Sequence, residues 1–129
     1  MCIRDRWYSY YDDTHVDGPR GLDIDHMVPL AEAWDSGAFD WSTQRRETYA
    51  NDVDDPVALV AVTARSNRGK ADHDPATWLP PHTPAVCRYI TEWVTVKTRW
   101  GLTVDTNEHD ALITTAAQCP NDPIPVRPA

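Results

Sequence analysis

"GLDIDHMVPLAEAW" (residues 21–34) is the stretch that decides the fold. In its first part, "LDIDH", apolar and acidic residues alternate with the period of two that indicates a β-strand. Pro29 has no backbone N–H to donate, so the strand is expected to end before it. The following "LAEAWDSG" predicts a short helix with Gly37 at its C-terminal cap. We therefore expect the pair Asp25 and His26 where a strand ends and a helix is about to begin.

A second strand and a short helix are predicted further along the chain. "VALVAVT" (57–63) is an apolar run typical of a buried strand, and the polar "ARSNRGKADHDP" (64–75) is expected to begin a helix. The two strands can pair as a hairpin with the helical residues 30–50 inserted between them, and the short helix would pack across it. This order predicts an α+β fold whose hairpin and helix bring three polar side chains into one cleft: Asp25, His26 and Asn67.

Local signals predict the other elements. They are a strand in "WYSYY" (7–11), a loop in "DDTHVDGPRG" (12–21), a helix in "DWSTQRRETYAND" with Asp40 or Ser42 as N-cap, a helix from Thr83-Pro84 to Trp100 that Gly101 ends, and a last helix opened by a capping box of Asp105 and Glu108.

The chain of 129 residues suits one domain, which we place at residues 7–119. The Pro-rich residues 120–129 are expected to be a disordered tail.

The composition excludes some classes of protein. No apolar run approaches the roughly 18 to 20 residues of a membrane-spanning helix, so no membrane partner is expected. The 12 Lys and Arg residues against 20 Asp and Glu residues give a formal net charge of -8. This balance argues against a broad basic surface for nucleic acid, but it leaves room for a local basic patch.

The polar residues of the predicted cleft suggest a chemistry. Carboxylate and amide oxygens are hard ligands suited to Mg²⁺ or Mn²⁺, and a neutral imidazole beside the metal can take a proton from water. Several cations could hold flanking phosphates: Arg65, Arg68 and Lys70, with Arg45 or Arg46. Together these groups would make a one-metal phosphodiester hydrolase.

Two motifs also resemble a known family. "DIDHMVP" is similar to the signature that opens the motif of HNH, or ββα-metal, endonucleases, and "SNRGKAD" is similar to the segment that closes it. The wider chain, from about Trp7 to Cys119, resembles HNH proteins related to the C-terminal domain of GmrSD restriction endonucleases. The resemblance implies a ββα-metal core with additional helices around it. It also implies Asp25 and Asn67 as metal ligands and His26 as the general base.

One position departs from the family pattern. Many HNH enzymes have a middle Asn that orients the loop carrying the base, and the matching position here is Ala58. Asn51 is a candidate for that role from another loop. Asp23 is a candidate for a supporting residue that holds His26 or a water on the metal.

The function expected from the resemblance is endonuclease activity on DNA, with RNA as the other candidate substrate. The alternatives are a catalytically inactive module with this fold that binds nucleic acid or a partner, and a toxin domain of a larger protein with an inhibitor protein as partner. Retention of Asp25, His26 and Asn67 together favours the active enzyme. We expect the protein to be a monomer.

The cysteines predict a compartment. The first six residues, "MCIRDR", resemble a translated sequencing adapter, and we expect residues 1–6 to be a non-native leader, which removes Cys2 from the count. Cys87 and Cys119 remain, each near one end of a predicted helix, and the two helices could run antiparallel. We expect a disulfide between them and therefore a secreted or extracytoplasmic protein. The alternative is a cytosolic enzyme with two free buried thiols.

Overall fold

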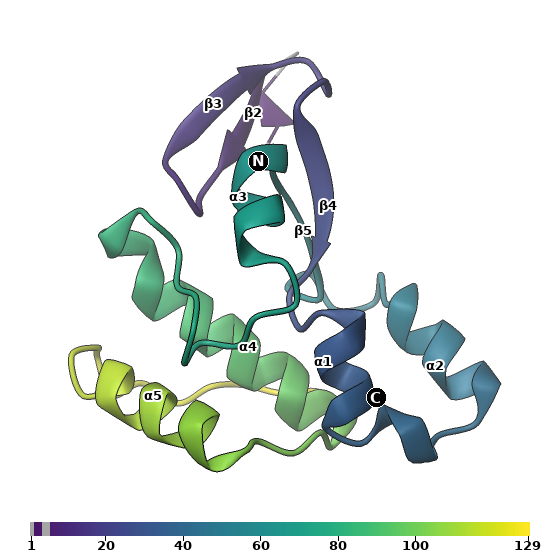
Figure 1. Ribbon diagram of the computed structural model, residues 1–129. Coiled ribbons are helices and arrows are strands. Elements are labelled where there is room, and N and C mark those ends of the chain that lie inside the picture. Colours follow the sequence, from purple (N-terminus) through teal and green to yellow (C-terminus); the bar gives the residue numbers. More distant parts are fainter. Residues whose placement is uncertain (1, 4–5) are drawn as a thin grey trace.

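The computed structural model describes residues 2–3 and 6–129, so residues 1, 4 and 5 of the expected leader lie outside it (Figure 1). The described part of the chain is a mixed α/β fold with two small antiparallel sheets and five α-helices, which confirms the expected class in its coarse form. Its strands are β1 (Cys2–Ile3), β2 (Arg6–Ser9), β3 (Thr14–Asp17), β4 (Leu22–His26) and β5 (Leu59–Thr63). Its helices are α1 (Leu30–Asp35), α2 (Thr43–Ala50), α3 (Ala64–Lys70), α4 (Val86–Trp100) and α5 (Thr106–Ala116), with the 3-10 helices η1 (Ala38–Asp40) and η2 (Thr83–Ala85).

The hairpin predicted from the opening stretch is present. β4 pairs antiparallel with β5, and the register sets Asp25 opposite Val60 and His26 opposite Leu59. The inserted segment contains α1, η1 and α2, as expected for residues 30–50. α3 follows β5 directly and packs against both strands (Figure 1). A helix therefore lies across a two-stranded sheet, with the end of β4 beside it.

The prediction of a loop at residues 12–21 is wrong. This segment contains β3, which pairs with β2 so that Val16 lies opposite Trp7 and His15 opposite Tyr8. The rings of Tyr8 and His15 are 4.9 Å apart, which adds a side-chain contact to the pairing. The Asp and Gly residues of the segment belong to the turns at either end of the strand. The many Asp and Gly residues of the segment predicted a loop, although the strand itself contains the β-branched residues Thr14 and Val16.

Most predicted helix boundaries are confirmed. Ser42 is the N-cap of α2, and its hydroxyl accepts from the Arg45 amide, so the choice between Asp40 and Ser42 falls on Ser42. Asp105 and Glu108 form the expected capping box of α5. Gly101 ends α4 in the left-handed conformation, with φ of 65°, which a glycine adopts without strain.

Two boundaries differ from the prediction. The cap of α1 is Ser36 rather than Gly37, and the Ser36 hydroxyl donates to the carbonyl of Glu32. Gly37 is instead the N-cap of η1, with φ of 139°. The helix expected from Pro84 begins as η2, and its regular α-helical part starts at Val86.

The core is rich in aromatic residues. One face of α4 is buried and carries Tyr89, Trp93 and Trp100. The Tyr89 ring contacts the ring of Tyr11 at 5.4 Å and that of Trp78 at 5.5 Å, so α4 is packed against the chain around β2 and the segment after α3. In the described part of the chain, no helix is long and apolar enough to cross a membrane.

Buried ion pairs join α4 to the rest of the molecule. Arg99 donates to both carboxylate oxygens of Asp52, at 2.8 and 3.1 Å, and to the carbonyl of Arg127. Lys97 pairs with Glu32 at 2.9 Å and with Glu108 at 3.1 Å. Residues 120–129 form neither helix nor strand. Arg99 holds their main chain, because its guanidinium donates to the Arg127 carbonyl and its own carbonyl accepts from the Ala129 amide.

A buried lysine joins α3 to the end of β4. The side chain of Lys70 has no exposed surface, and its ammonium contacts Asp25 Oδ2 at 2.5 Å, the His26 carbonyl at 2.8 Å and the Met27 carbonyl at 2.7 Å. An ammonium has three donors, and here each has an acceptor. The ring centroids of Tyr11 and Tyr89 lie within 6 Å of Nζ, at 5.8 and 5.6 Å.

The expectation that Lys70 contacts a phosphate does not agree with this position. Its charge is enclosed by the protein and bonded to acceptors of β4 and the segment after it. Burial lowers the pKa of Lys70, and its pairing with Asp25 acts in the opposite direction. Burial likewise raises the pKa of Asp25, against the effect of Lys70 and of the Tyr11 hydroxyl. Lys70 is therefore a structural cation that fixes the end of β4.

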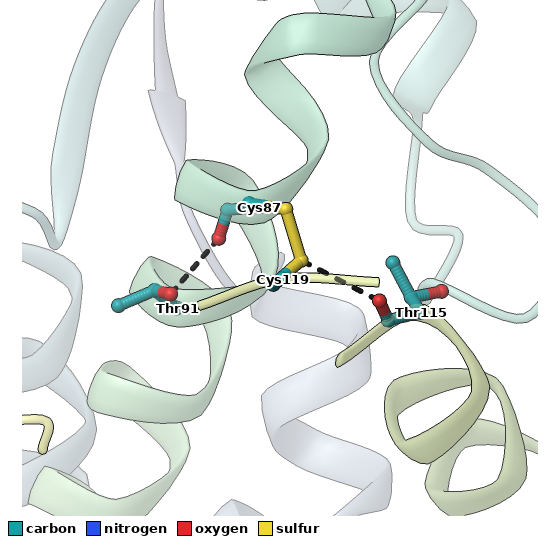
Figure 2. Close-up of a disulfide and its surroundings, with 4 residues drawn as sticks. All are labelled: Cys87, Thr91, Thr115 and Cys119. Carbon is teal, nitrogen blue, oxygen red and sulfur yellow. Dashed lines mark hydrogen bonds between the residues drawn. A yellow bond between two sulfur atoms is a disulfide. The ribbon is translucent and has the colours of Figure 1, made fainter. Parts of the chain in front are cut away.

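The expected disulfide is present between Cys87 and Cys119 (Figure 2). The two Cα atoms are 5.7 Å apart and the sequence separation is 32. Cys87 lies in the first turn of α4, and Cys119 lies just beyond α5, with its sulfur 3.4 Å from the carbonyl of Thr115. The bond therefore joins the start of one helix to the end of its neighbour, as antiparallel packing requires.

Replacing both cysteines, as Cys87→Ser with Cys119→Ser, should lower the free energy of unfolding by about 3 to 4 kcal/mol, the value that chain entropy gives a loop of this length. Urea unfolding of the variant and the wild type measures the difference. Intact mass with and without reductant confirms the bond in the wild type. An unfolding midpoint that does not change on reduction would contradict this stabilisation.

Lys70→Met should lower the free energy of unfolding by about 3 to 5 kcal/mol, because it leaves the Asp25 carboxylate buried without its cation. Arg68→Ala is the matched control, since Arg68 is an exposed cation of the same helix and its loss should change stability by about 0.5 kcal/mol or less. Urea unfolding of the two variants gives the comparison. Equal effects would refute the structural role of Lys70.

Candidate active site

Four of the predicted site residues lie where β4 runs beside α3: Asp23 and Asp25 on the strand, and Asn67 and Lys70 on the helix. Asp23 and Asp25 are two residues apart on β4, so they project from the same side of the strand. Asn67 and Lys70 are three residues apart on α3, so they share one face of the helix. Asn67 Nδ2 donates to Asp23 Oδ2 at 2.9 Å, and Lys70 bonds Asp25. Two parallel contacts thus fix the register of α3 on β4.

Asp25 is the most buried of the three predicted catalytic residues, since His26 and Asn67 are partly exposed. It is buried, and its Oδ2 accepts from the Tyr11 hydroxyl at 2.7 Å as well as from Lys70. Both contacts fall on the same oxygen, so Oδ1 is the oxygen left to face a ligand. Tyr11 was not among the predicted site residues. Its position within the aromatic run "WYSYY" gave no sign that its hydroxyl would reach a carboxylate of the next sheet.

The ring of His26 is held by α2. Its Nε2 lies 2.8 Å from the main-chain carbonyl oxygen of Ala50, the last residue of that helix. A carbonyl oxygen only accepts hydrogen bonds, so Nε2 carries the proton and Nδ1 of the neutral ring has the lone pair. His26 is partly exposed, so this nitrogen can be reached from solvent. The arrangement suits a base that acts through Nδ1.

Asn51 does not contact His26 with its side chain. Its Nδ2 donates to the carbonyl of Glu47 within its own helix, at 2.9 Å. The residue before it, Ala50, supplies the carbonyl that orients the imidazole. The orientation expected from an asparagine side chain is therefore provided by a main-chain group one position away, which no side-chain pattern in the sequence could reveal.

The remaining predicted cations occupy different surroundings. Arg68 is exposed on α3, and Arg65 is exposed and lies 3.7 Å from Asp12. Arg46 is partly buried and donates to the carbonyls of Ala38 and Trp41. Arg65 and Arg68 are thus available at the surface, whereas the guanidinium of Arg46 bridges the turns between α1 and α2.

Another group of carboxylates lies outside this region. Glu32, Asp74 and Glu108 have side-chain oxygens within 4.8 Å of one another, a spacing that a metal ion could use. Lys97 is bonded to Glu32 and Glu108, so an ammonium already neutralises part of this charge. Trp93 also donates to Glu108, at 2.9 Å. We therefore interpret the group as a structural ion-pair network.

Comparison with known proteins identifies the family. An uncharacterized secreted protein of Arthroderma benhamiae is 40% identical over 113 residues, which cover 88% of this chain and 55% of that protein. The chain thus spans about half the length of this relative. No solved structure matches the chain. Residues 1–115 match the family described as GmrSD restriction endonucleases, C-terminal domain. The chain belongs to the GmrSD C-terminal domain family, which is related to restriction endonucleases.

Proposed function

We propose that this protein is a metal-dependent endonuclease that hydrolyses phosphodiester bonds of DNA with a ββα-metal, or HNH, unit formed by β4, β5 and α3. The observation that carries the proposal is the position of His26. Its ring is oriented by Ala50, and it lies next in sequence to Asp25, whose strand is bonded to α3 through Asn67 and Lys70. Membership of a restriction-endonuclease family supports a nuclease role.

The oxygen donors of Asp25 on β4 and Asn67 on α3 fit a hard divalent cation. Lys70 and Tyr11 both bond Oδ2 of Asp25, which leaves Oδ1, and Asn67 has its amide oxygen left when Nδ2 donates to Asp23. Oxygen donors of this kind suit Mg²⁺ or Mn²⁺, so Asp25 and Asn67 are the proposed ligands. When bound, the ion would stabilise the negative charge that develops on the phosphate and the leaving oxygen.

His26 acts as the general base in the proposed mechanism. Nδ1 accepts a proton from a water molecule as the water oxygen bonds to phosphorus and the P–O bond to the leaving oxygen breaks. The hydrogen bond from Nε2 to Ala50 keeps the ring in the required tautomer and stabilises the positive charge that it gains. Asp23 keeps the Asn67 amide oriented and is a positioning residue. The substrate is DNA in this proposal, and RNA is the second nucleic acid to test.

The exposed cations of α3 are the proposed contacts for flanking phosphates. Arg68 and Arg65 lie on the same helix as Asn67, so a backbone that reaches the site passes near them. A net charge of -8 keeps general affinity for DNA modest, and these cations would supply a local positive surface. The disulfide and the secreted relative support an extracytoplasmic location for the enzyme.

His26→Ala and Asn67→Ala should fail in different ways. His26→Ala should lower the cleavage rate by a factor on the order of 10² to 10⁴ without changing the Mg²⁺ dependence, because the ring acts on water. Asn67→Ala should shift the dependence to higher Mg²⁺ and regain part of its rate there. Plasmid nicking against Mg²⁺ concentration, with EDTA as the metal-free reference, measures both effects.

His109→Ala is the control for this pair, since His109 is exposed on α5 away from the site. It should cleave at the wild-type rate. A folded wild-type protein that leaves plasmid intact at every Mg²⁺ and Mn²⁺ concentration would instead favour the inactive binding module. Full activity of His26→Ala would exclude it as the base.

Arg68→Ala should weaken binding to DNA about equally for all sequences and reduce the slope of log affinity against log salt by about 1, because one phosphate contact is lost. Arg88→Ala on α4 controls for the loss of one positive charge, since its side chain is 59% exposed. Fluorescence anisotropy in EDTA over a series of salt concentrations measures the slopes. Identical slopes in both variants would contradict the Arg68 contact.

A further inference from the structure

Three large apolar side chains are exposed on one small region of the surface. Leu30 and Trp34 of α1 are 49% and 50% exposed, and Phe39 of η1 is 59% exposed. The rings of Trp34 and Phe39 lie 6.5 Å apart. Exposed apolar groups that gather in this way commonly mark a binding surface. Both elements belong to the segment inserted between β4 and β5.

A cavity of about 320 Å³ opens beside these residues, between α1, η1 and α2. We call it the Trp34 pocket. Its walls are mostly apolar or aromatic, and the residues that line it include Leu30, Trp34, Trp41, Arg46, Tyr49 and Ala50. Figure 1 shows α1 and α2 near the end of β4 that carries His26. The pocket is thus formed by the same inserted segment that orients the imidazole.

Ala50 connects the pocket to the proposed active site. This residue lines the pocket, and its carbonyl oxygen is the acceptor 2.8 Å from His26 Nε2. Tyr49, the residue before it, donates from its hydroxyl to the carbonyl of Val28 at 2.6 Å, so the pocket wall is also fixed to the chain that follows β4. A group bound here would therefore contact the residue whose carbonyl holds the base.

The pocket is lined by one cation, Arg46, and one anion, Glu47, and Arg46 is the charged group that contacts the exposed Trp34 ring. The Arg46 guanidinium lies 5.3 Å from the centroid of the Trp34 ring, and its contacts with the Ala38 and Trp41 carbonyls hold it there. A fixed cation next to an exposed aromatic face matches a base and its phosphate. A cavity of this volume accepts one planar ring system, whereas a partner helix needs an extended groove.

We infer that the Trp34 pocket binds one unstacked nucleobase of the substrate, beside the phosphodiester whose attacking water His26 deprotonates. This inference rests on the proposed nuclease function and adds a subsite to it. Stacking on Trp34 would select unpaired or splayed nucleotides with little preference for sequence, because every base has an aromatic face. The substrate class is therefore single-stranded or locally opened nucleic acid.

The test measures binding of a short single-stranded DNA oligonucleotide in EDTA, where no cleavage occurs. Trp34→Ala should raise the dissociation constant about 5- to 150-fold, the usual effect of removing one stacking ring, and Trp34→Phe should retain most of the affinity. Ile113→Ala is the control, because Ile113 is 58% exposed but lies on α5. Circular dichroism establishes that each variant is folded.

An oligonucleotide with one abasic position, moved along the strand, gives a sharper readout. Wild-type binding should weaken when the abasic position reaches the pocket, and Trp34→Ala should lose this dependence. Equal affinity of Trp34→Ala and wild type, or abasic effects that survive in Trp34→Ala, would overturn the inference. So would a change of molecular mass in solution on mutation of Trp34, since that result assigns the patch to contacts between copies of the chain.

The inference and the proposed function fail separately. If the wild-type protein nicks plasmid with Mg²⁺ and Trp34→Ala binds and cleaves equally well, the base-binding role of the pocket is refuted and the nuclease function stands. If the wild-type protein never cleaves but binds the oligonucleotide through Trp34, the nuclease function is refuted and the base-binding pocket stands.

Discussion

The fold depends on one ammonium group removed from water. Lys70 belongs to the last turn of α3, and it can be buried only if all three of its donors find acceptors. It meets Asp25 and the carbonyls of His26 and Met27, where β4 ends. These acceptors set the distance of α3 from the hairpin. The aromatic rings of Tyr11 and Tyr89 close the space around the charge and join it to the core.

This constraint also explains why the proposed base is well placed. Lys70 bonds the main-chain carbonyl of His26, and Ala50 bonds its ring. Helix α3 thus holds the backbone of His26, and helix α2 holds its side chain. In the sequence, α2 precedes β5 and α3 follows it. A base that is already fixed in this way gives up little further rotational freedom when it binds a water molecule. The inserted helix α2 thus orients the proposed base.

The sequence predicted the elements that local patterns control. Alternation in "LDIDH" identified β4, the hydroxyl of Ser42 and the pair Asp105 and Glu108 identified helix starts, and two remaining cysteines predicted the disulfide. These features depend on neighbours in the chain. β3 was missed because its four residues lie between turn residues, and strand pairing with β2 outweighed the composition of the segment.

The sequence could not predict the surroundings of the site. A lysine two residues after an arginine in a polar helix has the pattern of a surface cation, and its burial depends on Tyr11 and Tyr89, which lie far from it in the chain. The role of Ala50 was equally hidden, because a main-chain carbonyl is present at every position. The strand-end pair Asp25 and His26, by contrast, was located correctly because its position follows from the strand and Pro29.

The disulfide has a consequence for how the protein would respond to its redox environment. Its two sulfurs join α4 to the chain just past α5, and none of the residues proposed to touch substrate is a cysteine. A reductant would therefore act on the folding equilibrium and leave the reacting groups chemically unchanged. Activity would then fall in proportion to the folded fraction, and any molecule that remained folded would keep its full turnover. Reduction of the disulfide would thus change the fraction of molecules that are folded, and it would not change the rate of each folded molecule.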